Sequence, residues 1–343
     1  MACGTETEAG SWPPGAKRHH FMVGPVRVLV ATNSPELAGL IRQRFRLLRG
    51  RRTAERPSQS LSIDLRECPD GCVPEARMPD RTLFSCVEQV RGWYEDDVLC
   101  MAGPGVHIRS RPAEGWAHVT IGRSCVDRKP RLVAETLVPF LLFELLRHRG
   151  LYHLHGAALV RGDRGLIIAG PTRSGKTTTA VSLIRRGFAC VADDDLFVQA
   201  GEDSVRVYGL PEEFTLAPTA AELFPELSFL TTRPPCGDGE KRSFDPQQVY
   251  GAAFAEKCAP RVLVFSSSNG GARTTLTPLS SAEAFVRAVP LSLLIALDRS
   301  IAADHAAALK HLVEHCACYA LSAGRDLRRE PWRLLEMLGM NTP

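Results

Sequence analysis

Residues 166–177 read LIIAGPTRSGKT, an apolar run followed by a glycine-rich loop. The apolar runs Ala157–Val160 and Leu166–Ala169 are separated by turn-forming residues, so they are expected to form a hairpin whose second strand leads into the loop. A helix from Lys176 to about Arg186 is expected to follow the loop and to end at Gly187. The loop has the spacing G-x-x-x-x-G-K-T, in which main-chain amides surround phosphate oxygens and the lysine reaches the β- and γ-phosphates. The N-terminus of the following helix adds a favourable dipole. The sequence therefore predicts a site for a nucleoside triphosphate.

The loop supplies the candidate nucleotide-binding residues. They are Gly170, Pro171, Thr172, Arg173, Ser174, Gly175, Lys176, Thr177 and Thr178. In this motif the hydroxyl of Thr177 is the expected ligand of a magnesium ion. ATP and Mg²⁺ are therefore the expected cofactors.

Three aspartates, Asp193, Asp194 and Asp195, end a second apolar strand, Phe188–Ala192. We expect this strand to lie beside Leu166–Ala169, with its carboxylates at the same edge of the sheet. One carboxylate can hold magnesium, and the other can accept a proton from an attacking hydroxyl. The alternative is a solvated acidic turn. The register within the triplet stays open, because Asp195 can replace either neighbour.

Two further segments offer candidate residues. His155 precedes the loop, where it is either a catalytic group or an ordinary packed histidine. Lys241 and Arg242 lie in a segment rich in proline and glycine that can close over the γ-phosphate and offset developing charge. A solvated surface loop is the alternative interpretation of that segment.

The rest of the chain predicts two domains. Residues 1–22 are expected to form a disordered leader, residues 23–130 a smaller α+β domain, and residues 131–343 an α/β phosphate-loop domain that begins with a connecting helix over 131–150. A helix is expected from Pro35 to about Leu48. The strands expected in the first domain are Val26–Ala31, Leu61–Leu65, Thr82–Val90, Trp93–Cys100, Val106–Arg109 and Ala117–Ile121.

Composition and the pattern of apolar residues limit the classes of protein to which this chain can belong. The net charge of +4 gives no reason to expect a nucleic-acid partner. The polar N-terminus lacks the apolar core of a signal peptide, and no apolar run reaches the roughly 20 residues that span a membrane. Eleven cysteines without repeated spacing fit reduced thiols. We therefore expect a cytoplasmic protein without a membrane partner.

Together, His155-Gly156, the loop Gly170–Thr177 and the segment Arg186–Asp194 (RGFACVADD) resemble the core of HPr kinase/phosphorylase. The resemblance covers about 45 residues, from Tyr152 to Asp195. It implies a phosphate-loop domain of the HPr kinase / phosphoenolpyruvate-carboxykinase type. It further implies Lys176 on the phosphates, Thr177 and Asp194 at magnesium, Asp193 as the base and His155 beside the acidic pair.

Two departures refine this resemblance. The glycine-rich C-terminal signature of the family is missing, so the reverse, phosphorolytic reaction is not expected. The N-terminal domain and the closing segments Tyr319–Leu321 and Gly324–Asp326 are more similar to the HPr-kinase-related proteins of bacterial peptide-modification cassettes. These relatives imply a serine on a ribosomal peptide as substrate, ahead of a small carrier protein. HPr kinases assemble into rings, which leaves a homo-oligomer open.

The function expected from the sequence is an ATP- and Mg²⁺-dependent kinase acting on a serine-type hydroxyl. One alternative is a nucleotide-switched, peptide-binding ATPase that transfers no phosphate. Another is a kinase of a small metabolite such as free serine.

Overall fold

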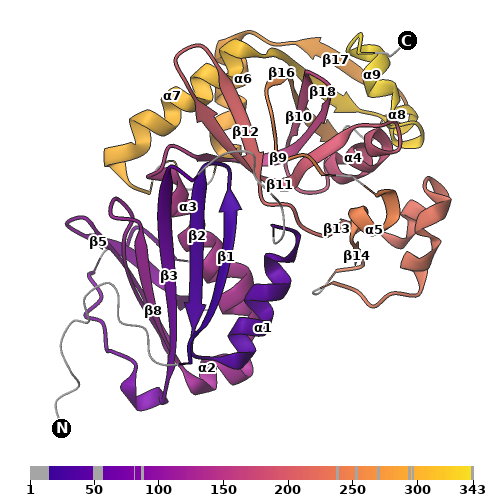
Figure 1. Ribbon diagram of the computed structural model, residues 1–343. Helices are drawn as coiled ribbons and strands as arrows, with labels where there is room; N and C mark the ends of the chain where they lie inside the picture. The colour runs from indigo at the N-terminus through magenta and orange to yellow at the C-terminus, as the bar shows by residue number, and fades with distance from the viewer. Residues whose placement is uncertain are drawn as a thin grey trace. The chain divides into compact units, whose positions relative to one another are not determined.

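The computed structural model describes residues 15–48, 57–80, 82–85, 89–236, 239–251, 254–268, 271–292, 295 and 297–340. These residues form two compact units, one up to His148 and one from Arg149 onward. Each unit is a mixture of helices with one eight-stranded sheet (Figure 1). Within the described residues, no helix is both long and apolar enough to cross a bilayer.

The sheet of the first unit has parallel strands at its centre. Its strands, in order across the sheet, are β1 (Lys17–Val23), β2 (Val26–Thr32), β3 (Gln59–Cys68), β8 (Trp116–Gly122), β7 (Val106–Arg111), β6 (Val98–Gly103), β5 (Arg91–Glu95) and β4 (Phe84–Ser85). The pairs β2–β3 and β3–β8 are parallel, and the remaining pairs are antiparallel. The helical segments are α1 (Pro35–Arg44), η1 (Arg46–Leu48), η2 (Asp70–Cys72), α2 (Arg123–Arg128), η4 (Leu132–Leu137) and α3 (Val138–Arg147).

Four expectations for this part of the chain need correction. The single strand expected over Trp93–Cys100 is divided between β5 and β6 by a turn at Asp96 and Asp97. Residues 17–22, expected to be disordered, form most of β1. The expected strand Thr82–Val90 is reduced to Phe84–Ser85, with residues 86–88 outside the described part. The helix expected over 131–150 packs within the first unit, where α3 contacts β3, because its apolar side chains face that sheet. Residues 1–14 of the expected leader lie outside the described residues.

The sheet of the second unit contains three parallel strands with antiparallel neighbours on both sides. Its strands, in order, are β15 (Lys257–Cys258), β12 (Val205–Gly209), β11 (Ala189–Ala200), β9 (Tyr152–Arg161), β10 (Arg164–Ala169), β16 (Pro260–Ser268), β18 (Ala317–Ala323) and β17 (Thr275–Pro278). The parallel strands are β10, β16 and β18. A short hairpin pairs β13 (Phe214–Leu216) with β14 (Arg242–Phe244).

Helices cover both faces of this sheet. One apolar core joins the sheet to α4 (Lys176–Ile184), to the segments η5 (Pro218–Glu222) and η6 (Pro225–Thr231), and to the C-terminal helices α8 (Arg325–Arg329) and α9 (Arg333–Met337). A second core joins the other face to α6 (Ser281–Ala288) and α7 (Arg299–His315). The remaining helical segments are α5 (Pro246–Tyr250) and η7 (Val289–Leu291).

The order of the central strands also differs from expectation. Strands β9 and β10 form the expected hairpin, but β9 continues and pairs with β11 as well. The strand that carries the three aspartates is therefore separated from β10 by β9. It also continues past the aspartates to Ala200, because it pairs with β12 beyond them.

A buried ion pair is part of the core of the first unit. Glu144 and Arg147 on α3 are almost fully buried, and Arg147 Nη2 donates to Glu144 Oε1 over 2.7 Å. The same carboxylate oxygen accepts a hydrogen bond from the hydroxyl of Tyr94 on β5 over 2.8 Å. The carboxylate therefore connects the helix to an outer strand of the sheet.

Removing this carboxylate should destabilise the first unit. Glu144→Ala removes a buried carboxylate that pairs with the buried Arg147 guanidinium, and breaking such a pair costs about 3–5 kcal/mol of unfolding free energy. Chemical denaturation would measure the loss. Glu135→Ala is the matched control, because it removes an exposed helical pair with Arg131, and it should change stability little. Equal losses in the two variants would contradict the role of the buried pair.

Candidate active site

The backbone conformation of the glycine-rich loop depends on its glycines. Gly175 ends the loop with φ +91°, and Gly170 begins it with φ +157°, where a Cβ would lie 2.4 Å from the Ser266 carbonyl oxygen. Glycine is thus required at position 170 by close approach to β16. Ser266 Oγ in turn donates to the Ser174 carbonyl oxygen over 2.9 Å. This hydrogen bond therefore holds the loop against β16.

Lys176 lies folded over the loop. It is buried, and its Nζ donates to the carbonyl oxygens of Gly170 at 3.0 Å and Pro171 at 3.1 Å. Burial lowers its pKa, and the negative charges of Asp194 and Asp193 act in the opposite direction. The ammonium group is thus held at the loop by two neutral main-chain acceptors. A charged phosphate oxygen would accept a stronger hydrogen bond from it than either of them.

Strand register brings the three sequence motifs to one edge of the sheet. Gly156 on β9 pairs with Ala169 on one side and with Asp194 on the other. A Cβ on Gly156 would lie 3.0 Å from the Ile168 carbonyl oxygen and 3.2 Å from Ala169 Cα, so the strands approach closely here. His155, the loop and the aspartates are neighbours as a result.

Asp193 is buried behind the loop. Its carboxylate accepts a hydrogen bond from the Thr177 hydroxyl, and within the described residues its Oδ1 has no hydrogen-bond partner. Burial, and then the charge of Asp194, raise its pKa from 3.8 to about 7, although Thr177, Lys176 and Lys241 favour the charged form. The surroundings of Asp193 therefore disfavour its ionised form, mainly because the carboxyl group is buried.

Asp194 points differently from its neighbour. Its side chain is 51% exposed, and its Oδ1 lies 3.7 Å from His155 Nε2 and 3.9 Å from Lys176 Nζ. Its φ of +102° is unusual for a residue with a side chain, and such strain is concentrated at functional sites. Burial and the Lys176 charge lower the pKa of His155, which favours a neutral imidazole beside this carboxylate.

Asp195 has a different partner, which the sequence reasoning missed. Its Oδ1 lies 3.0 Å from Nε2 of His153, a histidine that is almost fully buried. His153 and His155 are two residues apart on one strand and so share a face. This spacing of two residues was the signal in the sequence that could have identified His153 as a further candidate. The pairing with His153 makes Asp195 a poor substitute for either neighbour.

Lys241 and Arg242 are neighbours in the sequence, but their side chains have different interactions. The charge of Lys241 lowers the pKa of both Asp193 and Lys176, so this lysine acts on the site. Arg242 instead donates from Nη1 to the carbonyl oxygen of Lys241 over 3.3 Å, which turns its guanidinium back onto its own segment. The structure thus brings Lys241, but not Arg242, into electrostatic contact with the acidic pair.

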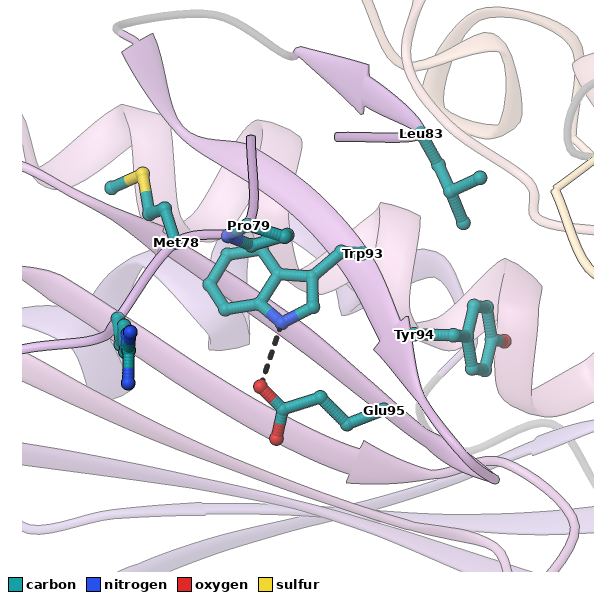
Figure 2. Close-up of a pocket in the computed structure, with 7 residues that line it drawn as sticks. Met78, Pro79, Leu83, Trp93, Tyr94 and Glu95 are labelled. Carbon is teal, nitrogen blue, oxygen red and sulfur yellow. Dashed lines mark hydrogen bonds between the residues drawn. The ribbon is translucent and has the colours of Figure 1, made fainter. Parts of the chain in front are cut away.

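Two cavities in the described part of the chain are also candidates for a ligand site. One of about 280 Å³ adjoins the loop at Arg173, Ser174, Gly175 and Thr178. The other, of about 500 Å³, lies in the first unit between Trp93 and the segment of Met78 and Pro79, with the Trp93 indole donating to Glu95 over 2.9 Å (Figure 2). The second cavity is larger, but it has neither a phosphate loop nor an acidic pair, so we assign the chemistry to the second unit.

Comparison with known proteins gives little beyond this geometry. No family model and no curated protein matches the sequence. Among solved structures, the chain is similar to the Hpr(Ser) kinase/phosphatase from Coxiella burnetii, with a TM-score of 0.22 and 19% identity. That match covers 33% of this chain and 63% of the other, so it spans less than two thirds of the length of its neighbour. A likeness this slight establishes neither fold nor function.

The buried carboxyl of Asp193 should make stability depend on pH in metal-free protein. Its folded pKa of about 7 lies above the unfolded value near 3.8, so folding favours the protonated form. The stability from that proton is fully present below the unfolded pKa and is lost as pH rises through the folded pKa. Asp193→Asn should therefore be more stable than the parent at pH 8 and no more stable at pH 4. Chemical denaturation in chelator at the two pH values would test this, and an equal difference at both would contradict it.

Proposed function

We propose that the second unit is an ATP- and Mg²⁺-dependent kinase that transfers the γ-phosphoryl group to a serine-type hydroxyl. The observation that carries the proposal is the pair Asp193 and Asp194 at the phosphate loop, one buried against Thr177 and the other half-exposed. Magnesium binding needs one such carboxylate, whereas phosphoryl transfer to a hydroxyl uses a second to orient the nucleophile. A nucleotide switch that transfers no phosphate does not need a second carboxylate.

The contacts favour Asp193, rather than Asp194, as the partner of Thr177 at magnesium. The Thr177 hydroxyl donates to Asp193, and burial, followed by the charge of Asp194, raises the pKa of Asp193, an effect that a bound cation would oppose. The oxygen that accepts no hydrogen bond within the described residues is a free ligand atom. Bound there, Mg²⁺ would neutralise charge on the phosphate oxygens. This reverses the roles expected from the sequence resemblance.

Asp194 then takes the place of the base. Its exposed carboxylate can accept a hydrogen bond from an incoming hydroxyl, which buried Asp193 cannot easily meet. His155 lies on one side of it and Lys176 on the other, so both side chains limit its orientation. The exposure of Asp194 supports a hydroxyl carried on a peptide or small protein, ahead of a free metabolite.

The two lysines would stabilise the charge of the transferring group. Lys176 would exchange the carbonyl oxygens of Gly170 and Pro171 for phosphate oxygens, because charged acceptors form stronger hydrogen bonds. Lys241 adds a second positive charge near the acidic pair. The loop amides would hold the remaining oxygens, so positioning and electrostatics supply most of the rate.

Substituting the two aspartates should separate their roles. We expect Asp194→Asn to lower kcat by about 10²- to 10⁴-fold while ATP affinity stays nearly unchanged, as for loss of a general base. Asp193→Asn should instead raise the magnesium concentration needed for half-maximal activity. Mass spectrometry of serine-containing peptides incubated with ATP would measure the transfer, with exposed Asp203→Asn as the control.

The same experiment distinguishes the alternatives. If ATP is hydrolysed but no peptide gains phosphate, and Asp194→Asn hydrolyses ATP like the parent, the switch is favoured and the kinase proposal fails. Phosphate gained by free serine but by no peptide would indicate a metabolite kinase.

Lys241 should matter to the rate more than to binding. Lys241→Ala removes positive charge where negative charge develops, so kcat should fall by roughly tenfold or more, in the direction seen when such stabilising groups are removed. Lys310→Ala is the matched control, because Lys310 is exposed on α7 and pairs with Glu314. Unchanged kcat in Lys241→Ala would remove this lysine from the mechanism.

A further inference from the structure

One face of the sheet in the first unit is covered by helices, and the other is open. Helices α1 and α3 contact strands β2 and β3, in which every second side chain, such as Val28 and Ile63, is fully buried. Of the alternate side chains, Arg27 is exposed, and Leu29 and Ser62 are half-buried. Because successive side chains of a strand point to opposite faces, these residues define a second face, which we call the open face.

Strand register gives the open face an excess of positive charge. Residues that are register partners share a face, so one row runs from Arg18 on β1 through Asp64, His118 and Arg109 to Trp93 on β5. By the same register, the open face of the described strands carries the arginines Arg18, Arg27, Arg66, Arg91, Arg109 and Arg111, but only the acidic residues Asp64 and Glu95.

Part of this positive charge is paired within the protein, and part is not. Arg111 forms ion pairs with Asp97 and Glu114. Arg27 and Arg66, by contrast, form no ion pair with another described residue. Clustered positive charge attracts anionic partners, and a guanidinium group matches the geometry of a carboxylate with two hydrogen bonds. The open face therefore favours a partner that carries carboxylates.

The row across the open face ends at the larger cavity, of about 500 Å³. Trp93 lines this cavity, and Figure 2 shows Met78 and Pro79 beside its indole. Two apolar residues of the lining, Met78 and Leu83, are 39% and 58% exposed. Exposed apolar side chains that gather at one place mark interaction sites, and pockets for ligands have volumes of about 300–1,000 Å³. The cavity can therefore accept an apolar side chain of a partner.

The cavity and the arginines are close enough for one short peptide to contact both. Arg109 and Trp93 lie on β7 and β5, with Cys100 of β6 between them in the row. Neighbouring strands are about 4.8 Å apart, so the two backbones are separated by about 10 Å. An extended peptide covers that distance in about three residues. A single segment can thus place an apolar side chain in the cavity and carboxylates against the arginines.

We propose that the open face and its cavity bind an acidic peptide segment that carries one apolar side chain. The segment is a part of the substrate outside the phosphorylated serine, so the identity of the occupant rests on the proposed function. A nucleic acid suits the surface less well, because Asp64 and Glu95 lie on the same face and Met78 and Leu83 offer no partner to a phosphate. Docking of this kind lowers the KM for the peptide and leaves kcat unchanged.

The first test measures binding to the full chain by fluorescence anisotropy. The probes are short labelled peptides of Asp, Glu and Gly with one central Leu, Phe or Trp, and they lack hydroxyl groups, so phosphate transfer cannot affect the result. We expect Leu83→Asp and Arg109→Ala each to weaken binding by about tenfold or more, because an apolar contact and a charge-assisted hydrogen bond are lost.

Both substituted residues are exposed, so neither change disturbs a core, and Met78→Asp is a second variant at the cavity. Val286→Asp and Arg206→Ala are the matched controls, because they change an exposed apolar residue and an exposed arginine of the second unit. Both controls should bind the probes like the parent.

The second test connects docking to the reaction. Joining the probe that binds most tightly to a serine-containing peptide should lower the KM for phosphorylation by about tenfold in the parent without changing kcat, as for added uniform binding. In Leu83→Asp, the joined and unjoined peptides should have the same KM.

Absence of binding by any probe would overturn the inference, as would equal binding of probes in which Gly replaces the apolar residue or Asn and Gln replace the acidic ones. Tighter binding of a labelled single-stranded oligonucleotide that depends on Arg109 would overturn it in favour of a nucleic-acid surface. An unchanged KM on joining would overturn the assignment of the segment to the substrate. These results leave the kinase proposal intact, whereas docking without phosphate transfer to any serine peptide would overturn the kinase proposal alone.

Discussion

The pairing of Gly156 with both Ala169 and Asp194 is the constraint on which the site depends. A strand inserted between β10 and β11 would ordinarily separate the phosphate loop from the acidic residues by two strand spacings. Because Gly156 has no side chain, β9 approaches the end of β10 closely, and His155 is the next residue along β9. The histidine of β9, the lysine at the start of α4 and the carboxylates of β11 then occupy one small region.

Two charged groups of that region are buried. Asp193 is buried with a raised pKa, and Lys176 is buried with a lowered one, so each residue shows the cost of desolvation. Structural ion pairs also perturb pKa values, but here the hydrogen bonds of the lysine go to main-chain oxygens, and Asp194 Oδ1 lies farther away, at 3.9 Å. The arrangement resembles a site prepared for anionic phosphate and a cation together.

Local patterns predicted the parts of this structure that depend on local interactions. The strand, loop and helix around Gly170–Thr177 and the β9–β10 hairpin follow from turn residues and apolar periodicity. The insertion of β9 beside β11 depends on pairing between distant segments, which no local pattern records. Strand β1 was missed because Lys17–His20 is basic, as suits an edge strand but not a core one.

The candidate site divides in the same way. His155, Lys176 and the acidic triplet could be named from motifs, whereas the contact between Thr177 and Asp193 required coordinates. The bond between His153 and Asp195 is likewise a matter of register between two strands. The cavity beside the phosphate loop could not be anticipated at all, since its lining runs from Arg173 to Pro331 in sequence.

The backbone conformation of Asp194 lowers stability at a position whose side chain is proposed to serve the reaction. A residue with a side chain at φ +102° costs on the order of 1–3 kcal/mol, which glycine would avoid. Glycine, however, would bring no carboxylate to the substrate hydroxyl. The strained backbone at this position is therefore the stability cost of placing a carboxylate where the proposed reaction uses one.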